Sequence, residues 1–258
     1  MNFLPPKHHD EPSVFRPENL LREARRQKNL PVGDVPARCL LDPDGDILRY
    51  LLATGQAVPD PHWACYHTTL YRFGYRGVTF GVIGCAVGAS FAVLLAEQLF
   101  VSGCRLLVSI TSAGKLDLAG EAPDYVLIGE ALRDEGTSAH YLPPGEPVRL
   151  AEPLRNALLA GFALLDLPVG LGTSWTTDAP YRETASAIEA ARALGAVAVE
   201  MEAAALYAFA QTRRRDVVCY AHLTNAMAQH GDDFEKGAEN GSLLALEVLH
   251  HTARFLLP

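Results

Sequence analysis

The sequence predicts an α/β domain built on a largely parallel or mixed sheet with helices on both faces. Short apolar runs typical of strands alternate with longer helical patterns from residue 36 onward. The chain has 258 residues, a length that suits one large α/β domain. It contains no internal repeat, coiled-coil heptad or low-complexity tract, and no linker composition follows residue 36. One domain over residues 36–258, preceded by an extension over residues 1–35, is the simplest organisation.

The extension contains one predicted helix. The first residues, MNFLPPKHHDEP, have no apolar core of the kind that defines a signal peptide. Residues 17–29 read PENLLREARRQKN and predict a short helix that begins near Pro17. The prolines between positions 31 and 36 end it.

Apolar runs and punctuating glycines define the remaining elements. Gly55 ends one predicted helix, and Gly103 lies just past the end of another. The most apolar stretch, residues 78–95, is interrupted by three glycines, so a strand, turn and helix explain it better than a membrane span. The predicted strands are 37–41, 78–84, 105–111, 124–130, 169–175, 196–200 and 216–224. The predicted helices are 46–55, 90–103, 153–165, 183–195, 201–211 and 241–256.

Composition narrows the class of protein. Apolar residues make up 49% and charged residues 20%, as in soluble globular proteins. The net charge of −8 argues against a surface that coats nucleic acid, although a local cluster of donors can still hold one phosphate. The five cysteines form no CxxC pair and no metal-binding spacing, which favours reduced core cysteines in a cytoplasmic protein. No cofactor, metal, nucleic-acid partner or membrane partner is expected.

Four predicted loops follow strand ends, where open α/β sheets bind their ligands. The first, GCAVGAS (84–90), offers backbone N–H groups around Gly88 at a helix start. The second, ITSAGKLD (110–117), contains Ser112 among small residues. The other two are TSWTTDAPYRET (173–184) and HLTNAMAQHGDDF (222–234). Each alone could be an ordinary turn, but four at strand ends indicate a ligand site.

The stretch AVAVEMEAAAL (196–206) places Glu200 and Glu202 inside the most core-like part of the chain. An unpaired buried carboxylate is costly, so either both side chains reach solvent or a ligand repays the cost. The predicted helix start favours negative charge, which explains part of the pattern. The small residues that follow leave room for a bound molecule.

These motifs resemble those of the purine nucleoside phosphorylase and uridine phosphorylase superfamily, which includes the methylthioadenosine and adenosylhomocysteine nucleosidases. EMEAAAL is similar to the family signature, and the other segments occur in family order. The matching segments are CAVGAS, ITSAGKL, LRDEGTSAHYLP (132–143), TTDAPYRE and LTN. The resemblance covers roughly residues 36–256 and implies a three-layer α/β/α fold with a mixed central sheet.

The resemblance also implies cleavage of the N-glycosidic bond of a nucleoside. For this chain the resemblance implies that Glu202 binds the ribose hydroxyls, that Met201 packs against the sugar and that Glu200 has a structural role. Asn225, beside Thr224, takes the position that contacts the base, and an amide there favours a pyrimidine or a 6-oxopurine. Because Pro180 replaces a stacking phenylalanine of many members, Tyr181 or Trp175 either stacks on the base or packs in the core.

The phosphate-binding arginines of the family have no matching arginine here. Ile47 and Ser109 stand at two of the positions, and the Tyr66–His67 region stands at the third. Arginine is the usual bidentate ligand of phosphate. Phosphate would then have to be bound by other residues of the nucleophile region, namely Gly88, Ser112 and the cations Arg133, Arg182, Arg72 and His67.

Three functions remain open at this level. Phosphorolysis of uridine or a 6-oxopurine nucleoside, with phosphate as co-substrate, is the first. Hydrolysis is the second, with a base sought among Asp42, Asp44 and Asp46, although three acids in a turn are commonly only solvated. A nucleoside-binding protein without catalysis is the third. Since family sites are completed by a neighbouring subunit, a homo-oligomer between a dimer and a hexamer is expected.

Overall fold

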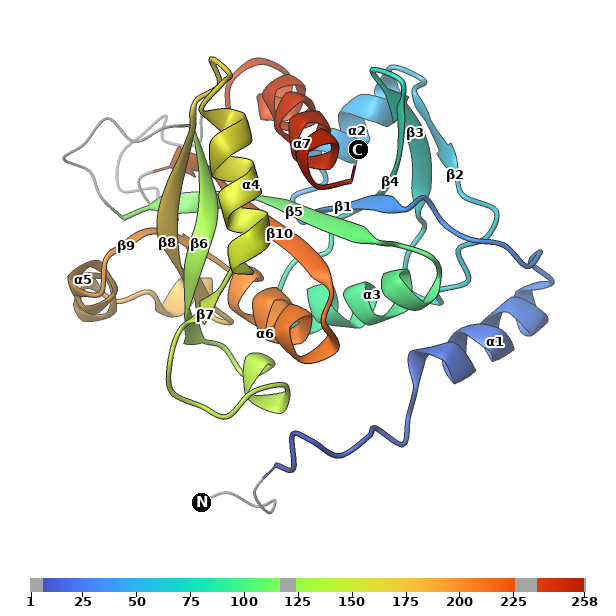
Figure 1. The fold of residues 1–258 in the computed structure, drawn as a ribbon, viewed down its shortest axis with the longest axis horizontal. Helices are drawn as coiled ribbons and strands as arrows, with labels where there is room; N and C mark the ends of the chain where they lie inside the picture. The colour runs from blue at the N-terminus through green and yellow to red at the C-terminus, as the bar shows by residue number, and fades with distance from the viewer. Residues whose placement is uncertain (1–6, 117–123, 226–235, 258) are drawn as a thin grey trace.

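The computed structural model describes residues 7–116, 124–225 and 236–257. Within these ranges, ten strands form one mixed sheet (Figure 1). The strands are β1 (Arg38–Asp42), β2 (Ala57–Pro59), β3 (Tyr71–Tyr75), β4 (Val78–Gly84), β5 (Leu106–Lys115), β6 (Tyr125–Asp134), β7 (Val148–Arg149), β8 (Val169–Thr177), β9 (Ala196–Glu200) and β10 (Asp216–Asn225).

Strand β5 joins two parts of this sheet. Its first half pairs in parallel with β1, ending where Leu41 faces Ser109. Beyond the end of β1, Gly114 and Lys115 pair with β9 in antiparallel fashion. On its other edge β5 pairs with β10, which continues through β6 and β8 back to β9. These pairings close a ring of five strands, β5–β10–β6–β8–β9, at the end of β5 that lies beyond β1.

Helices cover both faces of the sheet, as the sequence predicts (Figure 1). One group contains α3 (Ala89–Val101), which packs against both α6 (Ala203–Arg213) and α1 (Pro17–Lys28). The other contains α7 (Ser242–Leu256), which packs against α2 (Asp46–Ala53) and α4 (Glu152–Phe162). Helix α5 (Ala185–Ala193) packs on β9. The expected three-layer α/β/α fold with a mixed central sheet is therefore confirmed.

Helix α6 lies deep in the core, and its sequence explains why it can. Every side chain from Ala203 to Phe209 is buried, and most are alanines. Small side chains let the helix approach both α3 and the strands closely. Tyr207, whose hydroxyl donates to the Ile128 carbonyl at 2.6 Å, ties the helix to β6. The helix start, next to Glu202, is therefore held rigidly.

Most predicted elements occur with ends shifted by a few residues, and the short ones were missed. Strand β6 runs to Asp134 rather than to residue 130, because it continues beside β8. The prediction omitted β2, β3 and β7, which are short antiparallel strands without a long apolar run. It also omitted three 3₁₀ helices, Ser138–His140, Pro180–Arg182 and Ala238–Gly241.

The cysteines follow the prediction except at one position. Cys39, Cys65, Cys104 and Cys219 are buried free thiols, whereas Cys85 is exposed in the turn after β4, so the core assignment was wrong there. Among the helices that the structure describes, none combines the length and apolarity needed to cross a bilayer.

Candidate active site

A cavity of about 470 Å³ opens at the strand ends where the ring of five strands closes. The structure brings all four predicted strand-end loops to it. The first contributes Val87, the second contributes Thr111, Ser112 and Gly114, and the third contributes Pro180, Tyr181 and Glu183. The fourth contributes Asn225, while residues 226–234 of that loop lie outside the described residues. The remaining lining residues are Pro43, Asp44, Val199, Glu200, Met201 and Glu202.

Both carboxylates of the EME motif are buried, so neither escapes to solvent. Glu200 accepts four hydrogen bonds, from the hydroxyls of Ser174 and Thr176 and from the main-chain N–H groups of Glu202 and Ala203. Burial raises the pKa of Glu200, and these donors oppose that rise. With its oxygens so engaged, Glu200 fixes the junction between β9 and α6.

Glu202, in contrast, keeps an oxygen without a partner. Its side chain is 1% exposed, and Oε1 accepts a hydrogen bond of 2.7 Å from the Gly88 N–H. Oε2 is buried and accepts no hydrogen bond of normal geometry from a described residue, although the nearby Thr111 hydroxyl lowers the pKa of this carboxyl. Burial, followed by the negative charge of Glu200, raises the pKa of Glu202 to about 8. A buried carboxylate at a cavity wall with an unpaired oxygen is suited to a ligand that brings hydroxyl donors.

Gly88 is positioned to bind Glu202 by the turn between β4 and α3. Its φ of +96° lies in the left-handed region, which explains a glycine at this point. Nothing lies within 4 Å of the place where a Cβ would stand, so the requirement is conformational rather than steric. The turn aims the Gly88 N–H at the start of α6.

Asp44 is the one acid of the turn after β1 that lines this cavity in the described structure. Its carboxylate accepts hydrogen bonds of 2.7 Å from both the N–H and the hydroxyl of Ser112. Lys236 Nζ lies 3.5 Å from it. Asp44 therefore stands at the cavity wall, fixed by Ser112 on β5.

The other two acids of that turn have structural partners. Asp42 is buried and accepts from the N–H groups of Gly45 and Leu48, which holds the start of α2. Burial raises the pKa of Asp42 to about 7. Asp46 pairs with Arg49 and with Lys236.

Some of the residues that the resemblance assigns to the sugar and the base line the cavity, and others do not. Met201, Tyr181 and Asn225 line the cavity. Tyr181 is 99% exposed, so no described residue covers its ring. Thr224 is buried outside the cavity lining and accepts a hydrogen bond of 3.1 Å from Asn225 Nδ2. Thr224 thus orients the amide at the end of β10.

Trp175 requires a correction, because its ring does not line the cavity. It is 4% exposed and packs in a core cluster with Leu116, Leu132 and Val199. Its indole N–H donates to Asp134 at 3.0 Å. Strand alternation places this side chain on the face of β8 that packs into that cluster.

Of the residues considered for binding phosphate, only Ser112 lines the cavity. Ser109 is buried in β5 between β1 and β10, and Gly88 contributes its N–H to Glu202. Arg133 donates to the Ser138 hydroxyl and to the carbonyls of residues 142 and 143. Arg72 pairs with Asp60, and Arg182 and His67 are exposed. None of these four cations lines the cavity.

Two polar lining residues were not singled out by the sequence. Thr111 lies one residue before Ser112 on β5, and Glu183 follows the 3₁₀ helix of the TTDAPYRE segment. Burial raises the pKa of Glu183. Both residues lie inside predicted loops. The sequence therefore indicated these loops but not the individual side chains.

The comparison with protein families decides the classification. Residues 45–253 match the model of the phosphorylase superfamily. The chain belongs to the phosphorylase superfamily. Within that superfamily, it is 25% identical over 235 residues to a uridine phosphorylase of Thermococcus kodakarensis, covering 80% of this chain and 83% of the relative.

Solved structures show the same phosphorylase fold. A purine nucleoside phosphorylase of Toxoplasma gondii in complex with immucillin-H superposes with a TM-score of 0.70 at 17% identity, covering 85% of this chain and 90% of the other. A uridine phosphorylase of Vibrio fischeri complexed with 6-hydroxy-1-naphthoic acid gives a TM-score of 0.71 at 17% identity, covering 85% and 92%. The family resemblance read from the motifs is therefore confirmed.

Proposed function

We propose that this protein cleaves the N-glycosidic bond of a nucleoside by phosphorolysis, releasing the free base and a pentose 1-phosphate. The observation that carries the proposal is the Glu202 carboxylate, which Gly88 anchors through one oxygen while the other oxygen has no described partner. Two neighbouring hydroxyls of a ribose supply the donors that such a group lacks. The names of the uridine and purine nucleoside phosphorylases that the chain resembles support the same reaction.

The reaction passes through a sugar with oxocarbenium character, which carries positive charge. In the proposed mechanism the ribose hydroxyls donate to Glu202 and so favour its ionised form, which stabilises that charge, and Met201 packs against the sugar. Negative charge develops on the departing base. The Asn225 amide donates to that base, which stabilises the leaving group.

The proposed substrates are uridine and 6-oxopurine nucleosides. An amide can donate to a carbonyl oxygen or to a ring nitrogen, and it supplies no proton as a carboxylic acid would. Thr224 accepts from Asn225 Nδ2, which favours one orientation of the amide. Tyr181, exposed at the cavity wall, is the remaining candidate for stacking on the base.

Hydrolysis is the second candidate, and Asp44 is the observation that favours it. Its carboxylate lies in the cavity wall together with Glu202 and Glu183, and it is oriented by two hydrogen bonds from Ser112. Carboxylates repel phosphate but can orient and deprotonate a water. For phosphorolysis, a neighbouring subunit of a homo-oligomer is proposed to supply the phosphate-binding cation.

The test is release of free base from inosine, guanosine, uridine, thymidine, adenosine and methylthioadenosine, each with and without phosphate. Phosphate-dependent release supports phosphorolysis and identifies the base. Equal release without phosphate assigns the second candidate. Ligand binding without any turnover would contradict both reactions and leave a nucleoside-binding protein.

A further inference from the structure

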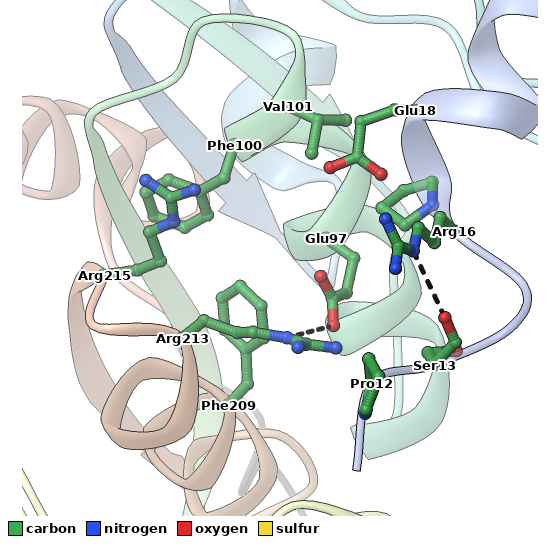
Figure 2. A pocket seen from close by; sticks show the side chains of 11 residues that line it. Pro12, Ser13, Arg16, Glu18, Glu97, Phe100, Val101, Phe209, Arg213 and Arg215 are labelled. Carbon is green, nitrogen blue, oxygen red and sulfur yellow. Dashed lines mark hydrogen bonds and ion pairs between the residues drawn. The ribbon is translucent and has the colours of Figure 1, made fainter. Parts of the chain in front are cut away.

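A second cavity, of about 300 Å³, lies under the N-terminal extension (Figure 2). It shares no lining residue with the cavity that contains Glu202, which is the proposed nucleoside cavity. Its walls come from the segment before α1, from the first turn of α1, from α3, from the end of α6 and from the residue before β10. Glu202 precedes the first residue of α6, and Arg213 is its last. At 1.5 Å per residue, the helix separates the two cavities by roughly 16 Å.

Three arginines line this second cavity, one from the segment before α1 and two from the junction of α6 and β10, although the protein carries a net charge of −8. Arg16 precedes α1, Arg213 ends α6 and Arg215 precedes β10. Figure 2 shows the Arg215 guanidinium over the Phe100 ring, and the Glu97 carboxylate between the side chains of Arg213 and Arg16. The arrangement gathers guanidinium groups around an apolar wall.

The hydrogen-bonding capacity of these arginines is mostly unused. The Arg215 side chain makes no hydrogen bond or ion pair with the described residues, and its guanidinium lies 5.4 Å from the centroid of the Phe100 ring. Arg16 donates from Nε to the Ser13 carbonyl at 3.3 Å, and its two Nη groups have no described acceptor. Stacking on an aromatic ring leaves the N–H edge of a guanidinium directed outward.

Two carboxylates border the same cavity, and one of them is already engaged. Glu97 Oε1 accepts from Arg213 Nε at 3.0 Å and from the Tyr141 hydroxyl at 3.0 Å. The Nη groups of Arg213 make no hydrogen bond with the part of the chain described. Glu18 is exposed in the first turn of α1, where the helix dipole stabilises its charge. With three guanidinium groups and two carboxylates among its lining residues, the cavity carries a net positive charge.

We propose that this cavity is a binding site for the phosphoryl group of a small ligand, held by Arg16, Arg213 and Arg215. Guanidinium forks match phosphate oxygens bidentately, and three of them line this cavity. The phenylalanine rings give the body of a small organic phosphate an apolar surface. The volume suits inorganic phosphate or a sugar phosphate and lies at the lower limit of ordinary ligand pockets.

Isothermal titration calorimetry on the full chain tests the site, with inorganic phosphate and ribose 5-phosphate titrated separately at low ionic strength. Binding of both shows recognition of the phosphoryl group alone, and a preference for ribose 5-phosphate shows that the sugar contributes. The double variant Arg16→Gln/Arg215→Gln should bind at least about tenfold more weakly. Both side chains are exposed, so the variant should unfold at the same temperature as the parent without ligand.

A control variant tests whether the phosphoryl group binds in this cavity rather than elsewhere on the protein. Arg214→Gln removes an exposed positive charge from between the two pocket arginines 213 and 215, and it should leave binding unchanged. No binding by the parent, equal weakening by Arg214→Gln, or undiminished binding by Arg16→Gln/Arg215→Gln would each overturn the proposal. The last outcome would place the phosphoryl group at another site, such as the nucleoside cavity.

Discussion

The main-chain N–H of Gly88 donates a hydrogen bond of 2.7 Å to Oε1 of Glu202. The two residues are far apart in the chain, and the bond joins the turn after β4 to the start of α6. It explains how a carboxylate can be buried in a defined orientation before any ligand is bound. Since Gly88 engages one oxygen, the other remains for a substrate.

Replacing Glu202 by alanine should abolish turnover while the fold persists. Loss of a charge that stabilises the oxocarbenium-like sugar is expected to lower kcat/KM by at least about 100-fold. The measurement is steady-state base release with the best nucleoside of the substrate panel. Circular dichroism and thermal unfolding check that the variant is folded. Activity equal to the parent would remove Glu202 from the site.

The raised pKa of Glu202 also predicts how stability depends on pH. Its pKa is 4.5 in the unfolded chain and about 8 in the folded protein. Between these values the native state holds a proton that the unfolded chain has lost, so its contribution to stability decreases as pH rises. This loss of stability is absent below pH 4.5 and complete above pH 8.

Glu202→Gln tests this prediction, because glutamine mimics the protonated acid. At pH 8.5 the variant should have a larger free energy of unfolding than the parent, by up to about 5 kcal/mol, and the difference should vanish near pH 4.5. Chemical denaturation across this pH range provides the measurement. Glu189→Gln on the exposed surface of α5 is the matched control and should show no such pH dependence. A pH-independent difference would contradict the buried titration.

Local sequence was sufficient to locate most elements of the core. Strand β4 has the predicted bounds, 78–84, because its apolar run lies between the turn at Gly77 and the turn after Gly84. The β9–α6 junction was also placed within two residues, since an apolar β-branched run changes there to a run of alanines. Strong local patterns of this kind depend little on distant contacts.

Contacts between distant segments explain what the sequence did not reveal. Nothing near Gly114 indicates that it pairs with Val199 and so closes the ring of five strands. For Trp175, the sequence left stacking and core packing open, and the choice depends on which face of β8 meets α5. Asp44 could not be separated from Asp42 and Asp46 because all three are turn acids, and only the hydrogen bonds from Ser112 on β5 distinguish it.

Exchange of Asn225 for aspartate should change the preference between bases. A carboxylic acid can protonate a departing purine, whereas the amide only donates a hydrogen bond. The ratio of kcat/KM for adenosine to that for uridine is expected to rise by about tenfold or more. Thr224→Val is the control for a change in amide orientation and should lower both activities without reversing the ratio. An unchanged ratio in Asn225→Asp would argue against contact with the base.

Replacement of Asp44 by asparagine distinguishes water from phosphate as the nucleophile. If water attacks, loss of the carboxylate should lower phosphate-independent base release by about 100-fold, because the general base is missing. If phosphate attacks, the same change removes a nearby negative charge, and KM for phosphate should decrease. Ser112→Ala is the companion variant, since it removes one hydrogen bond to Asp44 but retains the charge. No effect of Asp44→Asn on either reaction would exclude Asp44 from nucleophile activation.

Glu200 is expected to matter for stability more than for chemistry. Replacement by alanine leaves two hydroxyls and two main-chain N–H groups without their acceptor in the core. Unpaired buried donors should lower the free energy of unfolding by about 3 kcal/mol, and the melting temperature should fall accordingly. Glu200→Gln, which keeps one acceptor oxygen, should lose less. Chemical denaturation of both variants beside Ser174→Ala, which removes a single donor, ranks the contributions. A loss below about 1 kcal/mol in Glu200→Ala would show that the β9–α6 junction does not depend on this carboxylate.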